Sequence, residues 1–319
     1  EKNLAKMRRD LEKYRITYDT WFFESTLHDS GYVKETVDLL TEKGATYESE
    51  GALWLRTSDY GCEKDDVLRR ANGFYTYFAA DIAYHRNKFE QRGFDRVINI
   101  WGADHHGHVA RLKAALDILG LDGSHRLEIV LMQLVRLMRD GEVVRMSKRT
   151  GKAITLSDLL DEISCDAARY FFNSRAADTH LEFDLGLAVR EDNENPVYYV
   201  QYAHARVKSI LRNLEQEGVQ CSENPDLSLL KSEEELELIR ELARLTEEIR
   251  LAARDREPSR INRYVNNVAA AFHRFYTVSR IRDAETEALR DARVYLIRQV
   301  ATVIENGLSV FGVTAPDKM

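Results

Sequence analysis

Apolar residues in the middle of the chain alternate between strand-like runs and helical spacing. The run Val97–Trp101 ends at Gly102 and predicts a buried strand. Residues 109–119 carry apolar side chains at helical spacing, and residues 127–135 and 142–144 predict further strands. Strand, helix and strand in this order predict an α/β, Rossmann-like parallel sheet that binds ligands beyond the carboxyl ends of its strands.

From residue 196 onward the spacing of apolar residues is helical almost throughout. Residues 197–214 follow one helical stripe, and residues 215–231 are predicted to form a loop. Three further helices are predicted over 233–254, 258–282 and 287–308. Pro258 suits the start of its helix, because a missing N–H costs little there. The fold class is therefore an α/β portion followed by an all-α helical bundle.

The composition narrows the classes of protein to consider. A chain of 319 residues with 44% hydrophobic content can bury a core and form two domains. A net charge of −7 counts against a nucleic-acid partner, although a local basic face on an acidic protein can still bind folded RNA. No apolar run is long enough to cross a bilayer, no secretory segment is visible, and three scattered cysteines suit a reducing compartment. We therefore expect a cytoplasmic protein with no membrane partner.

Four cations lie within the eight residues Arg145–Lys152, directly after a predicted strand. On a loop they could close over a polyphosphate, with a lysine ammonium stabilising the charge that develops on the leaving group. A solvated basic loop is the alternative, and the glycine spacing excludes a Walker phosphate loop. Thr155, with Asp158 three residues later, is predicted to cap the next helix.

The segment Trp101–His108 lies where a predicted strand passes into a helix, so its backbone N–H groups could face a ligand. Asp104 could accept hydrogen bonds from ribose hydroxyls, and the histidines could donate to phosphate. Two other interpretations stay open at this point: a metal site built on Asp104, His105 and His108, or simple capping of the helix.

Tyr77 and Asp81 are one turn apart if residues 74–85 are helical. A carboxylate beside an aromatic hydroxyl suits a planar guanidinium, through charge-assisted hydrogen bonds and ring contact. An ordinary amphipathic helix with a surface aspartate would carry the same pair.

Taken together and in this order, five segments resemble the class I aminoacyl-tRNA synthetases, and specifically the arginyl-tRNA synthetases. Arg145–Arg149 resembles the Lys-Met-Ser-Lys-Ser signature loop, with Lys148 at the second lysine and an arginine at the first. The other matching segments are Trp101–Asp104 (adenosine ribose), Thr76–Tyr84 (arginine-binding helix), Asn195–Arg206 (start of the anticodon-binding domain) and Asp166–Arg169, which approximates Asp-Ala-Leu-Arg. The resemblance extends from about residue 15 to the end of the chain.

The resemblance implies the site residues. The implied catalytic residue is Lys148, which would meet the pyrophosphate. The implied ATP-binding residues are Gly102, Asp104, His108, Met146, Ser147, Lys148 and Arg149, with Lys152 as a lesser partner. The implied arginine-binding residues are Tyr77, Asp81 and His105. The implied tRNA-binding residues are Tyr199, Tyr202, Arg206, Tyr276, Arg280 and Met319. Phe272 and Phe275 are predicted to be core.

The resemblance also implies three regions and their ligands. Residues 1–153 would be the C-terminal part of the catalytic domain, 154–195 a connecting helical region, and 196–319 the anticodon-binding domain. The implied reaction attaches arginine to tRNA(Arg) through arginyl-adenylate, with ATP as cofactor, Mg²⁺ carried by the nucleotide and no metal bound by protein residues. The sequence leaves the oligomeric state open, with a monomer as the working expectation.

One departure from the family pattern limits these expectations. The His-Ile-Gly-His motif and the N-terminal tRNA-binding domain of the family are not found in these residues. We therefore expect a fragment of a longer protein with impaired activity on its own. The rival hypotheses are a synthetase-like RNA-binding protein without catalysis, a metal-dependent hydrolase built on residues 104–108, and a synthetase for cysteine or methionine.

Overall fold

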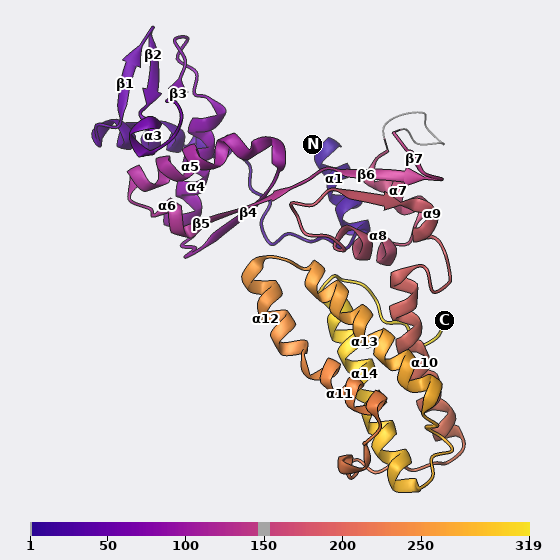
Figure 1. Cartoon of the computed structure of the whole chain (residues 1–319). Helices are drawn as coiled ribbons and strands as arrows, with labels where there is room; N and C mark the ends of the chain where they lie inside the picture. Colours follow the sequence, from indigo (N-terminus) through magenta and orange to yellow (C-terminus); the bar gives the residue numbers. More distant parts are fainter. Residues whose placement is uncertain (1, 146–153) are drawn as a thin grey trace. The chain divides into compact units, whose positions relative to one another are not determined.

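The chain divides into two compact units, which the computed structural model describes over residues 2–145 and 154–319 (Figure 1). The α/β unit is Tyr18–Leu134, and the helical unit combines Glu1–Thr17 with Val135–Met319. Each unit has its own hydrophobic core. This division differs from the predicted boundaries after residues 153 and 195, which follow function rather than compactness and stay a prediction.

The α/β unit pairs an antiparallel sheet with a short parallel one. Its elements in chain order are α2 (Ser25–Asp29), α3 (Tyr32–Glu42), β1 (Thr46–Ser49), β2 (Ala52–Leu55), η1 (Thr57–Tyr60), β3 (Asp66–Arg69), α4 (Tyr77–Glu90), β4 (Val97–Gly102), η2 (Ala103–His105), α5 (His106–Leu119), α6 (Gly123–Arg126) and β5 (Leu127–Met132). Strands β1, β2 and β3 are antiparallel, and the core lies where α3, α4 and α5 pack together.

The predicted strand–helix–strand unit is confirmed. Strands β4 and β5 pair in parallel, with Val97 opposite Leu127 and Gly102 opposite Met132. Helix α5 connects them and ends at Gly120, whose φ of +83° is the left-handed conformation that glycine adopts without strain. The turn that follows Gly102 therefore leaves the carboxyl end of a parallel strand, where this kind of sheet binds its ligands.

The prediction of one strand over residues 127–135 is wrong. Strand β5 ends at Met132, and β6 (Val135–Arg139) pairs with different strands in another sheet. Gln133 is the only polar residue between Ile129 and Val135, and neither it nor Leu134 is typical of a turn, so sequence alone did not reveal the change of partner. The predicted Asp140-Gly141 turn is present, with positive φ at both residues, and β6 pairs there with β7 (Glu142–Val143).

The helical unit is built around three long helices, α10, α13 and α14, which pack against one another (Figure 1). Its elements in chain order are α1 (Lys2–Lys13), β6, β7, α7 (Leu156–Glu162), α8 (Cys165–Phe172), β8 (Leu181–Asp184), α9 (Leu185–Ala188), α10 (Pro196–Gln216), η3 (Leu227–Leu229), α11 (Glu233–Ala243), α12 (Leu245–Asp255), α13 (Ser259–Val278) and α14 (Glu287–Ser309). Phe272 and Phe275 are fully buried, which confirms that both are core. None of the described helices is both long and apolar enough to cross a membrane.

The prediction of one helix over residues 233–254 is also wrong, because α11 ends at Ala243 and α12 begins at Leu245. A helix end leaves its last carbonyl groups without helical partners. Here the buried hydroxyl of Tyr264, on α13, lies 3.1 Å from the carbonyl oxygen of Glu241 and 3.2 Å from that of Leu242, and donates to them. A tertiary contact therefore stabilises the break, with no proline or glycine at it.

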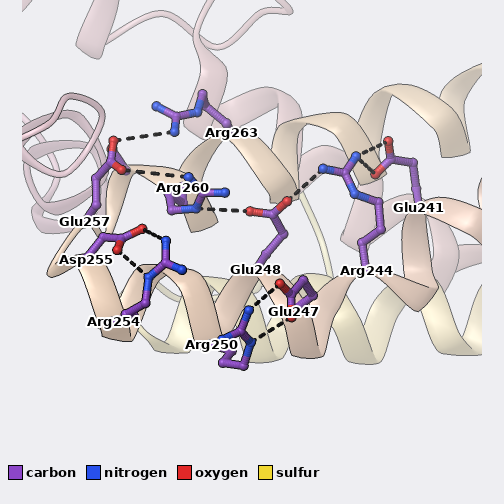
Figure 2. Close-up of polar contacts among 11 residues, drawn as sticks. Glu241, Arg244, Glu247, Glu248, Arg250, Arg254, Asp255, Glu257, Arg260 and Arg263 are labelled. Atoms are coloured by element: carbon purple, nitrogen blue, oxygen red, sulfur yellow. Dashed lines mark hydrogen bonds and ion pairs between the residues drawn. The ribbon is translucent and has the colours of Figure 1, made fainter.

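Charged side chains hold the two short helices together and against α13 (Figure 2). The guanidinium of Arg244 lies 3.0 Å from Glu241 on α11 and 2.7 Å from Glu248 on α12. The other oxygen of Glu248 lies 3.4 Å from Nε of Arg260 on α13. Glu248 is 9% exposed, so the carboxylate at the centre of this chain is shielded from water, whereas Arg244 is half exposed.

The residues that resemble the Asp-Ala-Leu-Arg signature form a clasp at α8, which we call the α8 clasp (Asp166 and Arg169). Arg169 donates to the carbonyl oxygens of Phe311 and, at 2.7 Å, Tyr14, so it joins the C-terminal segment to the segment after α1. Gly312 has φ +65°, and a Cβ there would lie 2.8 Å from Nε of Arg169. Only glycine therefore fits beside this guanidinium.

The aspartate of the α8 clasp has both carboxylate oxygens engaged. Oδ1 of Asp166 pairs with the guanidinium of Arg15. Oδ2 accepts from Nε2 of Gln201, at 2.9 Å, and from the hydroxyl of Thr314. Three segments that are far apart in the sequence thus meet at α8, which makes the clasp a structural joint of the helical unit.

Candidate functional site

The α/β unit contains a cavity of about 740 Å³ at the carboxyl end of β4. Three segments line it: the loop after η1 with Asp66, the first turn of α4 with Tyr77 and Asp81, and the turn and helix start from Asp104 to Arg111. The predicted arginine-binding residues and two of the predicted nucleotide-binding residues therefore share one cavity.

Tyr77 and Asp81, the residues predicted to bind a guanidinium, lie one turn apart at the start of α4. Thr76 caps this helix: its hydroxyl oxygen accepts from the N–H of Ala79 at 3.4 Å and donates to the carbonyl of Val67 at 2.7 Å. The cap places Tyr77 at the first helical position, where it is 83% exposed, and Asp81 one turn later on the cavity wall. The predicted helix and its shared face are thus present.

The turn after β4 depends on a glycine. A Cβ on Gly102 would lie 2.5 Å from Oδ1 of Asp104, so any larger residue would displace that carboxylate. The side chain of Asp104 is 82% exposed and lies 3.8 Å from Nε2 of His105, which also lines the cavity. Asp104 is therefore presented to the cavity with oxygens free to accept hydrogen bonds from a ligand.

His108 lies against the carboxylate of Asp81. The sequence-based prediction places His108 near the nucleotide phosphates, but its Nε2 is 2.8 Å from Oδ2 of Asp81 and its side chain is only 11% exposed. Its ring also packs against Trp101 and Phe78, with centroids 5.5 Å away in each case. His108 thus contacts Asp81, and its predicted place beside the nucleotide phosphates stays a prediction.

A buried histidine, His85, connects α4 to β4. Nδ1 of His85 donates to the carbonyl of Asp81 at 2.7 Å, and Nε2 accepts from the amide of Asn99, on β4, at 2.6 Å. Burial, together with the nearby ammonium of Lys88, lowers the pKa of His85 to about 4. The imidazole is therefore neutral at physiological pH and joins α4 to β4 directly behind Asp81.

Sequence reasoning missed several cavity residues, among them Cys62, Asp66 and Arg111. Arg111 follows His108 by three residues on α5, so helical spacing could have placed it on the same face. Asp66 lies on β3 and reaches the cavity only through the fold, and no short-range signal marks it.

The signature-loop residues Met146, Ser147, Lys148, Arg149 and Lys152 lie outside the described residues. Arg145 is described and exposed. The capping box predicted beyond the loop is confirmed, because the Thr155 hydroxyl accepts from the N–H of Asp158 at 3.2 Å and the Asp158 carboxylate accepts from the N–H of Thr155 at 3.0 Å.

An aromatic cluster on α10 and α13 contains most of the residues predicted to bind tRNA. The guanidinium of Arg206 lies over the ring of Tyr202 at 4.5 Å and over that of Tyr276 at 4.9 Å. The ring of His273, which sequence reasoning missed, lies 4.7 Å from Tyr199. Burial and the neighbouring Arg206 lower the pKa of His273, so the cluster is an arginine among neutral rings.

The remaining two predicted tRNA-binding residues, Arg280 and Met319, are exposed but lie outside this cluster. Helix α13 ends at Val278 rather than at residue 282, so Arg280 is in the loop that follows. The segment that leads to Met319 packs on another face of α10, where His204 donates to the carbonyl of Pro316 at 2.9 Å.

Among the residues that the structure describes, no three His, Cys, Asp or Glu side chains are grouped in a way that could hold a metal ion. The histidines of residues 104–108 instead contact Asp104, Asp81 and neighbouring rings.

Two family models match the chain. Residues 4–185 match the catalytic domain of class I tRNA synthetases (R), and residues 200–319 match the DALR anticodon binding domain. The first match alone covers more than half of the 319 residues.

Curated relatives and solved structures agree with these matches. The chain is 57% identical to the arginine–tRNA ligase of Caldanaerobacter subterraneus subsp. tengcongensis and 54% identical to that of Ruminiclostridium cellulolyticum. These alignments cover 100% of the chain but only 57% and 56% of the relatives, so the chain spans little more than half their length. A structure from Campylobacter jejuni that is assigned to the arginyl tRNA synthetases is 37% identical with a TM-score of 0.89, and the match covers 100% of this chain and 68% of that one. The chain belongs to the class I arginyl-tRNA synthetase family.

Proposed function

We propose that the chain is the part of an arginine–tRNA ligase that binds arginine, contributes to the nucleotide site and contacts the anticodon loop. The observation that carries this proposal is a single cavity in which Tyr77 and Asp81 lie beside the turn that starts at Asp104. Because the chain spans little more than half the length of its curated relatives, the activity is proposed for the full-length protein. The 319 residues alone are predicted to have impaired activity, and the cytoplasm is the expected location.

The proposed reaction has two steps and needs no covalent enzyme intermediate. The arginine carboxylate attacks the α-phosphorus of ATP, which gives arginyl-adenylate and pyrophosphate. The arginyl group then passes to the terminal 2′-hydroxyl of tRNA(Arg). Catalysis of this kind consists mainly of positioning and charge stabilisation, with Mg²⁺ entering on the nucleotide.

The amino-acid end of the cavity suits a guanidinium. Asp81 is partly exposed, its Oδ2 is held by His108, and its Oδ1 has no partner within the described residues. Oδ1 is thus free to accept a charge-assisted hydrogen bond from the substrate. Tyr77 supplies a ring and a hydroxyl one turn away, and His105 lines the same cavity.

The nucleotide end would use the turn after β4 together with the signature loop. Asp104 would accept from the ribose hydroxyls, and Gly102 leaves room for it. Met146 and Ser147 would lie along the nucleotide, while Lys148 and Arg149 would stabilise the pyrophosphate. This assignment of the loop rests on its sequence.

The aromatic cluster of the helical unit suits unpaired bases of the anticodon loop. Tyr199, Tyr202 and Tyr276 offer ring faces, and the guanidinium of Arg206 lies between two of them. Bases in RNA loops stack on such rings and hydrogen-bond to neighbouring polar groups. Arg280 and Met319 would approach the loop from outside the cluster.

The test is amino-acid-dependent ATP–pyrophosphate exchange by the full-length enzyme in the presence of tRNA(Arg). We expect exchange with arginine and none with cysteine or methionine. Lys148→Ala should slow exchange by about a hundredfold or more, because it removes a charge that stabilises the leaving group. The matched control is Lys113→Ala, which changes a half-buried lysine on α5 outside the cavity. Exchange that does not respond to arginine would refute the proposal.

A further inference from the structure

Arg111 lines the cavity but has no role in the reaction described above. It lies one turn after His108 on α5, and its Nε is 2.7 Å from Nδ1 of His108. The other ring nitrogen of His108 is 2.8 Å from Oδ2 of Asp81. The imidazole therefore lies between a guanidinium and a carboxylate.

These two contacts allow only one tautomer of His108. An arginine side chain carries donors and no acceptor, so Nδ1 of His108 must accept from Arg111 and cannot carry a proton. The proton is then on Nε2, from which it is donated to Asp81. A doubly protonated ring would set an N–H against the N–H of Arg111.

Arg111 is itself held in place by Asp66, on β3. Its NH1 is 2.6 Å from Oδ1 of Asp66, and its guanidinium carbon is 5.4 Å from the centre of the Phe78 ring. Both partners of this ion pair are largely covered, with side-chain exposures of 31% for Arg111 and 17% for Asp66. Four side chains from three elements thus form one chain of hydrogen bonds: Asp66, Arg111, His108 and Asp81.

The charges of this chain explain why a cation can lie so close to a site for a cationic substrate. Asp66 neutralises Arg111, and the neutral ring of His108 leaves the charge of Asp81 uncompensated. The chain therefore has a net charge of −1, which is complementary to one guanidinium. Without Asp66, the charge of Arg111 would repel the substrate.

We propose that Arg111 is a positioning residue for arginine binding, acting through His108. It keeps Nδ1 of His108 unprotonated, so that a neutral ring holds Oδ2 of Asp81 and leaves Oδ1 and the charge of Asp81 to the substrate. This inference rests on the proposed function, since it assumes that Asp81 receives the substrate guanidinium. Arg111 need not touch the substrate for this role.

The first experiment reads the tautomer without any substrate. Long-range ¹H–¹⁵N spectra of the chain with ¹⁵N-labelled histidine rings distinguish Nε2–H from Nδ1–H, and His108→Gln assigns the resonance. We expect the Nε2–H pattern in the unsubstituted chain and a second proton, on Nδ1, in part of the Arg111→Ala molecules, because Asp81 still accepts from Nε2 while Nδ1 no longer faces a donor. An Nδ1–H pattern in the unsubstituted chain, or an unchanged pattern in Arg111→Ala, would overturn the inference.

The second experiment reads the consequence for the substrate in the full-length enzyme. Arg111→Ala should raise KM for arginine by about tenfold, the effect of losing one hydrogen-bonded support, and leave KM for ATP and the maximal exchange rate little changed. Arg111→Lys keeps the charge and one donor, so it should recover part of the loss. The matched control, Arg126→Ala, removes an arginine with comparable contacts on α6, away from the cavity, and should leave KM for arginine unchanged.

The outcomes separate the inference from the function on which it rests. A second proton on His108 in Arg111→Ala with an unchanged KM for arginine would overturn the positioning role alone. An equal rise in the KM values of both substrates, or an equal effect of Arg126→Ala, would show a general structural role and would also overturn it. An unsubstituted enzyme that does not respond to arginine would overturn the proposed function, and that result does not depend on any Arg111 variant.

Discussion

Asp166 of the helical unit and Asp81 of the α/β unit are both helical aspartates, but their carboxylates are used differently. Both oxygens of Asp166 are engaged, one by Arg15 and the other by Gln201 and Thr314. Asp81 lines a cavity, with one oxygen held by His108 and the other without a partner within the described residues.

This difference separates a structural joint from the proposed binding site. A buried carboxylate with both oxygens satisfied contributes to stability and has nothing left to offer a ligand. A carboxylate with one fixed and one open oxygen is oriented for a ligand before the ligand arrives. Changes at the contacts of Asp166 should therefore lower stability, whereas changes at Asp81 should weaken the binding of a ligand.

The largest effect is expected from Arg169→Ala, which opens the α8 clasp. The carbonyl oxygens of Tyr14 and Phe311 would lose their donor, and we expect the helical unit to lose about 3 kcal/mol of unfolding free energy. Urea unfolding followed by far-UV circular dichroism measures this loss, because the long helices belong to this unit.

Tryptophan fluorescence provides an internal control for the same experiment. Trp21, Trp54 and Trp101 are the three tryptophans of the chain, and all lie in the α/β unit. Their transition should move little in Arg169→Ala. The matched control is Arg263→Ala, whose exposed guanidinium lies 3.5 Å from Glu257, with an expected loss below about 0.5 kcal/mol. Equal losses in the two variants would contradict the structural joint.

The next effect is on binding rather than stability. Asp81→Asn removes the charge that the substrate guanidinium would meet, so arginine affinity in the full-length enzyme should fall by about a hundredfold. The asparagine oxygen can still accept from His108, so the fluorescence-detected stability should change little. KM for arginine in the exchange assay measures the effect.

The control for this variant is a second aspartate of the same unit. Asp117, on α5, holds the N–H of Ser124 at 3.0 Å and lies outside the cavity. Asp117→Asn should therefore lower stability and leave KM for arginine unchanged. A loss of arginine affinity as large as that of Asp81→Asn would show that the cavity is not the arginine site.

The parts of the molecule that sequence reasoning predicted correctly are those fixed by local patterns. The strand ending at Gly102, the helix before Gly120 and the capping box of Thr155 each depend on residues within about one or two turns. The pair Tyr77 and Asp81 was found for the same reason, because helical spacing brings side chains four residues apart together.

The parts that sequence reasoning missed depend on contacts between distant segments. Asp66 reaches Arg111 across 45 residues, and the break after Ala243 is stabilised by Tyr264 of another helix. The contact between His108 and Asp81 joins two helices across 27 residues and was likewise not foreseen. No window of sequence contains these pairings.

A third effect concerns pH and the histidine behind Asp81. The pKa of His85 is about 4 in the folded chain against 6.5 in the unfolded one, because burial disfavours the charged ring. Between these values a proton binds the unfolded chain but not the folded one, so stability is lost as pH falls through this range. From pH 7.5 to 5.0 we expect the α/β unit to lose about 2 kcal/mol, from about 1.4 kcal/mol per pH unit.

Fluorescence-detected urea unfolding at the two pH values measures this loss. His85→Gln should be less stable at pH 7.5 but should lose less between pH 7.5 and 5.0 than the unsubstituted chain. His125→Gln, which changes an exposed histidine of the same unit, should keep the full pH dependence. A pH dependence that survives in His85→Gln would assign the titration to another group.

The smallest effect is expected at the break between α11 and α12. Tyr264→Phe removes the hydroxyl that donates to the carbonyl groups at the end of α11, so the unit should lose about 1 kcal/mol. The hydroxyl is buried, which raises the pKa of Tyr264 and keeps it a donor throughout the usable pH range.

Tyr295→Phe is the matched control, because the hydroxyl of Tyr295 has no hydrogen-bond partner within the described residues. If the two variants lose the same free energy in dichroism-detected unfolding, the break depends on the charges around Arg244 and Glu248 instead, and Glu248→Gln should then show the larger loss.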